Sequence, residues 1–146
     1  MDNMMDFLET SEPDSWIAAL PSYQRNTIVE MRARGESYDD IALTWIAAGA
    51  SNTAPFSTGG PPQPDPGFLE KLRVEVRAYL CGDKKYDRDR KQLIAGGKEI
   101  HAFVISGMSF GIAPFVGAAS IVIAPLIALI LAAIGKVSLN AWCATS

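Results

Sequence analysis

The sequence predicts an all-α protein in which a small helical head is followed by a C-terminal hydrophobic helical hairpin or a single membrane span. Apolar residues recur every three to four positions in residues 22–49 and 68–81, which is the period of an amphipathic helix. Residues 102–135 contain no Asp, Glu, Lys or Arg, and such an uncharged apolar run is typical of a membrane-spanning helix. The 146 residues are therefore expected to divide into a polar front and an apolar end.

Charge follows the same division. Residues 1–67 carry ten acidic and three basic residues, whereas residues 68–101 carry six acidic and nine basic residues. Residues 102–146 carry only Lys136, and the whole chain has a net charge of −3. Basic residues next to an apolar run favour the cytoplasmic side of a membrane. The predicted orientation therefore has the head inside, with the C-terminus outside after one span or back inside after a hairpin.

The first predicted element is an N-terminal arm, residues 1–21, that ends in a short amphipathic turn over Trp16–Leu20. Asp14 or Ser15 is expected to cap this turn, and Pro21 is expected to end it. We expect the apolar side chains of the arm to dock onto the same domain. The alternative is a linear motif in which Trp16 contacts a partner.

Residues 22–49 predict an acidic αα-hairpin. Ser22 is expected to cap a first helix that ends at Gly35, and Ser37 is expected to cap a second helix. Tyr38 and Trp45 lie on the apolar face of the second helix and are candidates for contact with a partner.

The same stretch resembles the opening of bacterial helix-turn-helix modules, through Ile28, Met31, Arg32, Gly35, Ser37, Ile41 and Ala42. That resemblance implies DNA binding. However, a DNA-binding module needs a basic face and a polar recognition helix. The segment is acidic and continues into GASNTAPFSTGGPPQPDPG, so we interpret it as a hairpin for packing or protein contact and do not expect a nucleic-acid partner.

The middle of the chain predicts a linker and two further helices. Residues 50–67 are rich in Pro and Gly, which favour an extended spacer. Residues 68–81 predict an amphipathic helix that Gly82 ends, and Asp83 is expected to cap a second, highly charged helix. Residues 68–99 are therefore expected to form an amphipathic and charged helical pair.

The hydrophobic segment, residues 100–146, predicts two helical pieces. The first, Ile100–Ala113, reaches only about 21 Å, whereas Ala118–Trp142 reaches about 37 Å and is long enough to cross a hydrocarbon core of about 30 Å. The side chains expected to face lipid or a protein core are Phe103, Ile105, Phe110, Phe115, Ile121, Ile123, Leu126, Leu129, Ile130, Leu131 and Ile134. The glycines expected to allow close helix packing are Gly107, Gly111 and Gly117. The residues expected at a membrane interface are Lys98, His101, Lys136 and Trp142.

Residues for catalysis or metal binding are scarce. The chain has one histidine, and its cysteines, Cys81 and Cys143, are 62 positions apart. This pattern predicts neither a metal site, nor a catalytic nucleophile, nor a disulfide scaffold, and we expect no enzyme activity, cofactor or small-molecule substrate. The acidic N-terminus does not have the pattern of a signal peptide, so the head is expected in the cytoplasm.

Together these features favour a small membrane-associated protein whose head binds a protein partner or self-associates. A pore-forming or membrane-disrupting bacterial effector is one form of this hypothesis. The alternative is a cytoplasmic, soluble helical oligomer or adaptor in which the apolar hairpin is a buried core. A helix-turn-helix regulator is the third hypothesis, which the acidic charge disfavours.

Overall fold

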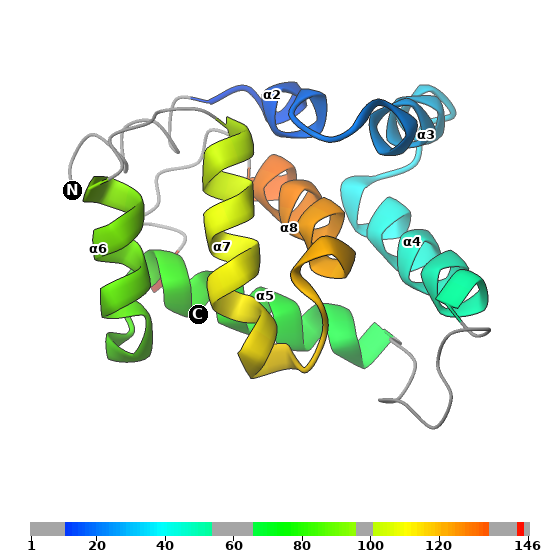
Figure 1. Cartoon of the computed structure of the whole chain (residues 1–146). Helices are drawn as coiled ribbons and strands as arrows, with labels where there is room; N and C mark the ends of the chain where they lie inside the picture. Colours follow the sequence, from blue (N-terminus) through cyan, green and yellow to red (C-terminus); the bar gives the residue numbers. More distant parts are fainter. Residues whose placement is uncertain (1–10, 54–65, 96–100, 135–142, 145–146) are drawn as a thin grey trace.

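The computed structural model describes residues 11–53, 66–95, 101–134 and 143–144. Within these ranges all regular structure is helical, which confirms the predicted all-α class (Figure 1). The helices are α2 (Pro13–Ala18), α3 (Ser22–Ala33), α4 (Tyr38–Thr53), α5 (Pro66–Cys81), the 3₁₀ turn η2 (Lys84–Tyr86), α6 (Asp87–Ala95), α7 (His101–Val116) and α8 (Ser120–Ile134).

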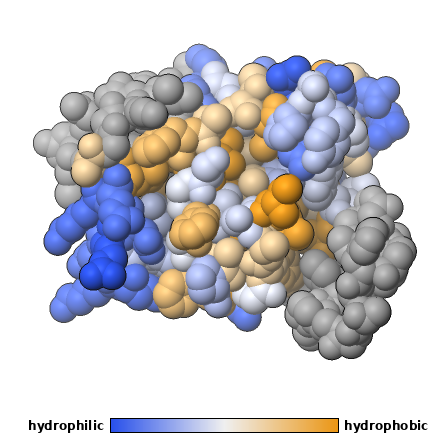
Figure 2. All heavy atoms as spheres, in the orientation of Figure 1, coloured by the Kyte–Doolittle hydropathy of each residue, from blue (hydrophilic) through white to orange (hydrophobic). Residues whose placement is uncertain are grey.

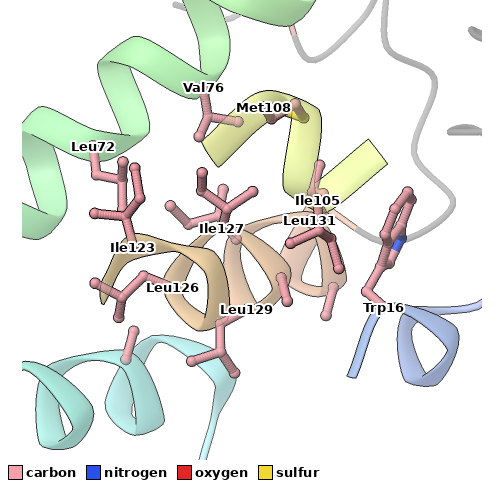
Figure 3. Close-up of a cluster of buried hydrophobic side chains, with 14 of the residues drawn as sticks. Trp16, Leu72, Val76, Ile105, Met108, Ile123, Leu126, Ile127, Leu129 and Leu131 are labelled. Carbon is pink, nitrogen blue, oxygen red and sulfur yellow. The ribbon is translucent and has the colours of Figure 1, made fainter. Parts of the chain in front are cut away.

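Helix α8 lies at the centre of the fold. It contacts α2, α4, α5 and α7, whose apolar side chains converge on it (Figure 3). Ile123 and Ile127 are fully buried, and one continuous hydrophobic cluster extends from Trp16 to Ala132. A helix that is apolar on all sides is stable in water only when its neighbours cover it, and here the amphipathic helices of the head do so.

The αα-hairpin of α3 and α4 forms largely as the sequence predicts. Gly35 has a φ of 89°, and the N–H groups of Gly35 and Glu36 donate to the carbonyls of Arg32 and Met31 at 2.9 and 3.2 Å. These bonds end α3 in the manner expected of a C-terminal glycine. The Oγ of Ser37 accepts a hydrogen bond from the Asp40 N–H at 3.1 Å, as predicted for the cap of α4.

The predicted cap of α3 was wrong by one residue. Pro21 occupies the N-cap position in an extended conformation and Ser22 is already helical. The carbonyl of Pro21 accepts the first helical bond from the Arg25 N–H, but proline has no side-chain acceptor, so no side-chain cap forms. Helix also extends into both ends of the predicted linker, because α4 continues to Thr53 and α5 begins at Pro66. Residues 54–65 lie outside the described residues.

The two apolar helices meet at a sharp bend. Helix α7 ends at Val116, Gly117 has a φ of 71°, and α8 turns away from α7 by 113°. The fifteen residues of α8 extend only about 22 Å, which is shorter than the predicted span, and residues 135–142 are outside the described part of the chain. Among the described helices none is by itself long and apolar enough to cross a membrane, and only the bent α7–α8 pair together would qualify.

Candidate functional site

Helices α7 and α8 expose a set of large apolar side chains that we name the apolar edge. It consists of Phe110, Phe115, Ile121 and Val122, whose exposed fractions are 77%, 41%, 73% and 38%. Figure 2 shows apolar side chains gathered over this pair of helices, with hydrophilic side chains of α6 on the left. Phe110 and Ile121 line one groove together, and large apolar side chains that are exposed side by side commonly mark a surface that binds lipid or protein.

The opposite faces of the same helices form the core. Among the residues expected to face lipid or core, Ile105, Ile123, Leu126, Leu129, Ile130 and Leu131 are buried, whereas Phe103 and Ile134 are partly buried. Phe110, Phe115 and Ile121 are exposed instead, so they do not contribute to the core of this fold. The sequence alone could not separate these two groups, because both lie in one uncharged run.

Phe115 packs against the head at a cluster formed by Glu75, Lys85 and Tyr86. The rings of Phe115 and Tyr86 meet edge to face with centroids 5.1 Å apart, and the Lys85 Nζ lies 4.6 Å from the centroid of the Phe115 ring. The Tyr86 hydroxyl donates to the Glu75 Oε1 at 2.6 Å, and the same oxygen lies 2.8 Å from the Lys85 Nζ. Asp83 positions this turn by accepting the Lys85 N–H at 3.0 Å, as the sequence predicts.

Burial raises the pKa of Tyr86 in this cluster and of the neighbouring Tyr79. Burial, followed by the hydrogen bond to Glu75, raises the pKa of Tyr86 far above its usual value. Burial also raises the pKa of Tyr79 to about 12, with a further contribution from the charge of Asp89. Both phenols are therefore expected to stay neutral where α5 meets the tip of the α7–α8 pair.

Gly107 and Gly111 allow a close approach that differs from the one expected in a membrane. A Cβ added at Gly107 would lie 2.6 Å from the Leu93 Cδ1, and one added at Gly111 would lie 3.2 Å from an Asp89 carboxylate oxygen. The close neighbour of both glycines is therefore the charged helix α6. Gly117 does not contribute to close packing, since an added Cβ there would meet no atom within 4 Å; its positive φ forms the turn instead.

A groove runs beside the apolar edge, between the start of α3 and the α7–α8 pair. Its volume is about 360 Å³, and its lining residues are all uncharged, among them Leu20, Tyr23, Ser106, Phe110 and Ile121. The lining includes serine hydroxyls, and that of Ser109 already donates a hydrogen bond within α7, from its Oγ to the Ile105 carbonyl at 2.6 Å. The groove therefore suits apolar side chains.

The three aromatic candidates for partner contact lie in different environments. Trp16 is only 1% exposed and its ring meets that of His101 edge-on at 4.5 Å, so it is a core residue and not an exposed contact. The expectation that the arm docks onto its own domain describes its position, and the alternative of a partner contact by Trp16 does not. Tyr38 and Trp45 are partly buried, and the Tyr38 hydroxyl donates to Asp14 Oδ1 at 3.3 Å.

The residues expected at a membrane interface are mostly outside the described ranges. Lys98, Lys136 and Trp142 lie there, so their predicted positions stay predictions. His101 begins α7, where its Nε2 lies 3.0 Å from the Ser11 Oγ. It therefore joins the apolar pair to the residues just before α2.

Cys81 and Cys143 form a disulfide with a Cα–Cα distance of 5.8 Å. The spacing of the cysteines did not predict this bond, because only the return of the chain through α7 and α8 brings these distant positions together. The bond also bears on topology. One membrane crossing between the two residues would separate them by a bilayer, so the closed disulfide is incompatible with a single span.

No family model, curated protein or solved structure matches the chain. The resemblance to helix-turn-helix modules therefore stays a prediction. Among the described residues no three of His, Cys, Asp and Glu are grouped so that they could hold a metal ion. The apolar edge and its groove are the features that a function must explain.

Proposed function

We propose that this chain is a membrane-associated helical protein that contacts lipid through the apolar edge of α7 and α8. The observation that supports this proposal is the exposure of Phe110 and Ile121, at 77% and 73%, on helices that contain no charged residue within 102–134. Transferring large apolar side chains from water into a bilayer yields about 1.5–3 kcal/mol for each one fully buried. The edge can therefore hold the chain at an interface while α8 stays in the core.

Deeper insertion follows from the same composition. Lipid tails are as apolar as the side chains that surround α8, so an exchange of protein neighbours for lipid has little apolar cost. The bent α7–α8 pair would then enter the bilayer as a hairpin, and the exposed edge would enter first. This is how the proposed protein would disrupt a membrane, as expected of a pore-forming effector.

Vesicle flotation tests the proposal. The full chain is mixed with phosphatidylcholine vesicles, and the bound fraction is compared for the wild type, for F110S/I121S, and for the control V29S. Val29 is also exposed, at 54%, but lies on α3 outside the groove lining. We expect V29S to float like the wild type and the double variant to lose most of its binding. Wild-type protein that stays with the aqueous fraction, or equal flotation of all three, would contradict the proposal.

A second candidate function is self-association of a soluble adaptor, which the uncharged groove beside the edge favours. Here the apolar side chains of a second copy would occupy the groove. S106W would fill the groove without removing the edge, and A33W on the exposed end of α3 is its control. Sedimentation velocity without detergent is expected to show a dimer that S106W alone dissociates. A monomeric wild type would exclude this candidate.

A further inference from the structure

The disulfide closes a loop that contains the whole apolar pair. Cys81 is the last residue of α5, and Cys143 lies nine residues beyond the end of α8. Helices α6, α7 and α8 are therefore all inside the loop. Since the two Cα atoms are 5.8 Å apart, the loop that contains the apolar pair begins and ends at the same point, the end of α5.

This tether restricts how α7 and α8 can meet a bilayer. A hydrocarbon core is about 30 Å thick, so a closed loop cannot have its two ends on opposite sides. The closed loop also limits how far α8 can move from α5, because loop closure removes much of the conformational freedom of the released segment. An open loop would permit both a single crossing and a wider separation of α8 from the head.

The bond is placed where a thiol can reach it. Cys81 is exposed and Cys143 is partly exposed, whereas the preceding Tyr79 and Leu80 are only 1% and 8% exposed. Gly82, with a φ of 100°, turns the chain away at once, so α5 ends at the surface with Cys81 at its last position. Thiol exchange requires such access to a sulfur atom.

We propose that Cys81–Cys143 is a redox-controlled lock that keeps the α7–α8 pair on the head, and that its reduction by a dithiol releases the pair into lipid. A thiolate of the reductant attacks the Cys81 Sγ, the Cys81–Cys143 bond breaks, and Cys143 leaves as a thiolate. The second thiolate of the reductant then attacks the mixed disulfide. The chain gains two thiols and the reductant becomes a disulfide.

If the disulfide is such a lock, the compartment in which the chain resides determines whether the α7–α8 pair is released. Thiols stay reduced in the cytoplasm and disulfides persist in oxidising compartments. A chain whose head is in the cytoplasm would therefore have the open form, in which the apolar pair is free to insert. An oxidising compartment would keep the pair closed and limit the chain to contact through the apolar edge. The inference rests on the proposed membrane association, because the released pair must have lipid to enter.

Dye leakage from phosphatidylcholine vesicles tests the lock, with flotation measured on the same samples. The oxidised and the dithiothreitol-reduced wild type are compared with C81S, C143S and the control S15A, which keeps the disulfide. We expect all forms to float. Leakage is expected to rise several-fold on reduction, and both cysteine variants are expected to be leaky without reductant and unresponsive to it. Circular dichroism checks that each variant is still helical.

The outcomes separate this inference from the proposed function. If the oxidised chain floats but leakage is the same in both redox states, the lock is wrong and membrane association stands. If C81S responds to dithiothreitol as strongly as the wild type, the reductant acts elsewhere and the lock is also wrong. If no form floats, the proposed function fails, and the inference fails with it.

Discussion

Helices α7 and α8 come from one uncharged run and yet have different surroundings. Nine of the fifteen residues of α8 are buried, compared with seven of the sixteen residues of α7. Helix α8 is enclosed by four helices, whereas α7 has one face open beside Phe110. Apolar composition therefore indicates only that a segment avoids water. Whether protein or lipid replaces the water depends on the neighbours that the fold provides.

The sharpest test of this difference compares two isoleucines of α8. Ile127 is fully buried and Ile121 is 73% exposed. Because an unpaired charge in the core has no compensating partner, I127D is expected to lower the free energy of unfolding by more than about 4 kcal/mol. I121D is expected to change it by less than about 0.5 kcal/mol. Urea unfolding followed by circular dichroism measures both, and similar losses would mean that the two positions do not differ in burial.

Removal of the disulfide tests whether packing alone stabilises α8 or whether the covalent bond also contributes to the free energy of unfolding. Removing a bond that closes a loop of 62 positions is expected to cost about 4 kcal/mol, mainly by freeing the unfolded chain. We therefore expect C143S to unfold at a lower urea concentration than the wild type while its helical content stays the same. A C81S/C143S double variant should match each single variant, since one bond is lost in every case. A second, additive loss would show that the cysteines contribute separately.

Alkaline pH tests the attachment of α7 to α5. Folding raises the pKa of Tyr79 to about 12 and raises that of Tyr86 as well, so both favour the folded state while they are neutral. Their contribution is complete below the unfolded value of 10.0 and is lost as the pH rises from there toward the folded values. The free energy of unfolding is expected to fall by about 1.4 kcal/mol per pH unit for each tyrosine. Y79F should reduce this slope, and exposed Y23F is the control.

The helices themselves were predictable, because local chemistry determines them. The end of α3 at Gly35, the Ser37 cap of α4, and the Asp83 cap of η2 all depend on residues within a few positions. The loss of the Ser22 cap has a local cause too, the extended Pro21 before it. Periodicity likewise indicated which faces of α5 pack inward.

The candidate site was less predictable, because it depends on contacts between distant segments. Gly107 and Gly111 were expected to allow close helix packing, but the sequence did not indicate that their close neighbour is α6. Trp16 was considered for partner contact, although the fold buries it against His101. The pairing of Cys81 with Cys143 needed the complete path of the chain. A pattern thus shows that a surface must be covered, and tertiary structure decides what covers it.

The smallest effect on stability belongs to the apolar edge, and it separates stability from function. Phe110 is 77% exposed, so F110A removes few packing contacts and is expected to change the free energy of unfolding by less than about 0.5 kcal/mol. The same variant should weaken vesicle binding several-fold, because the aromatic ring contributes most of its energy only after transfer to lipid. Flotation and urea unfolding of one preparation measure both effects. A variant that loses stability but keeps its binding would place Phe110 in the core and exclude it from the lipid-facing surface.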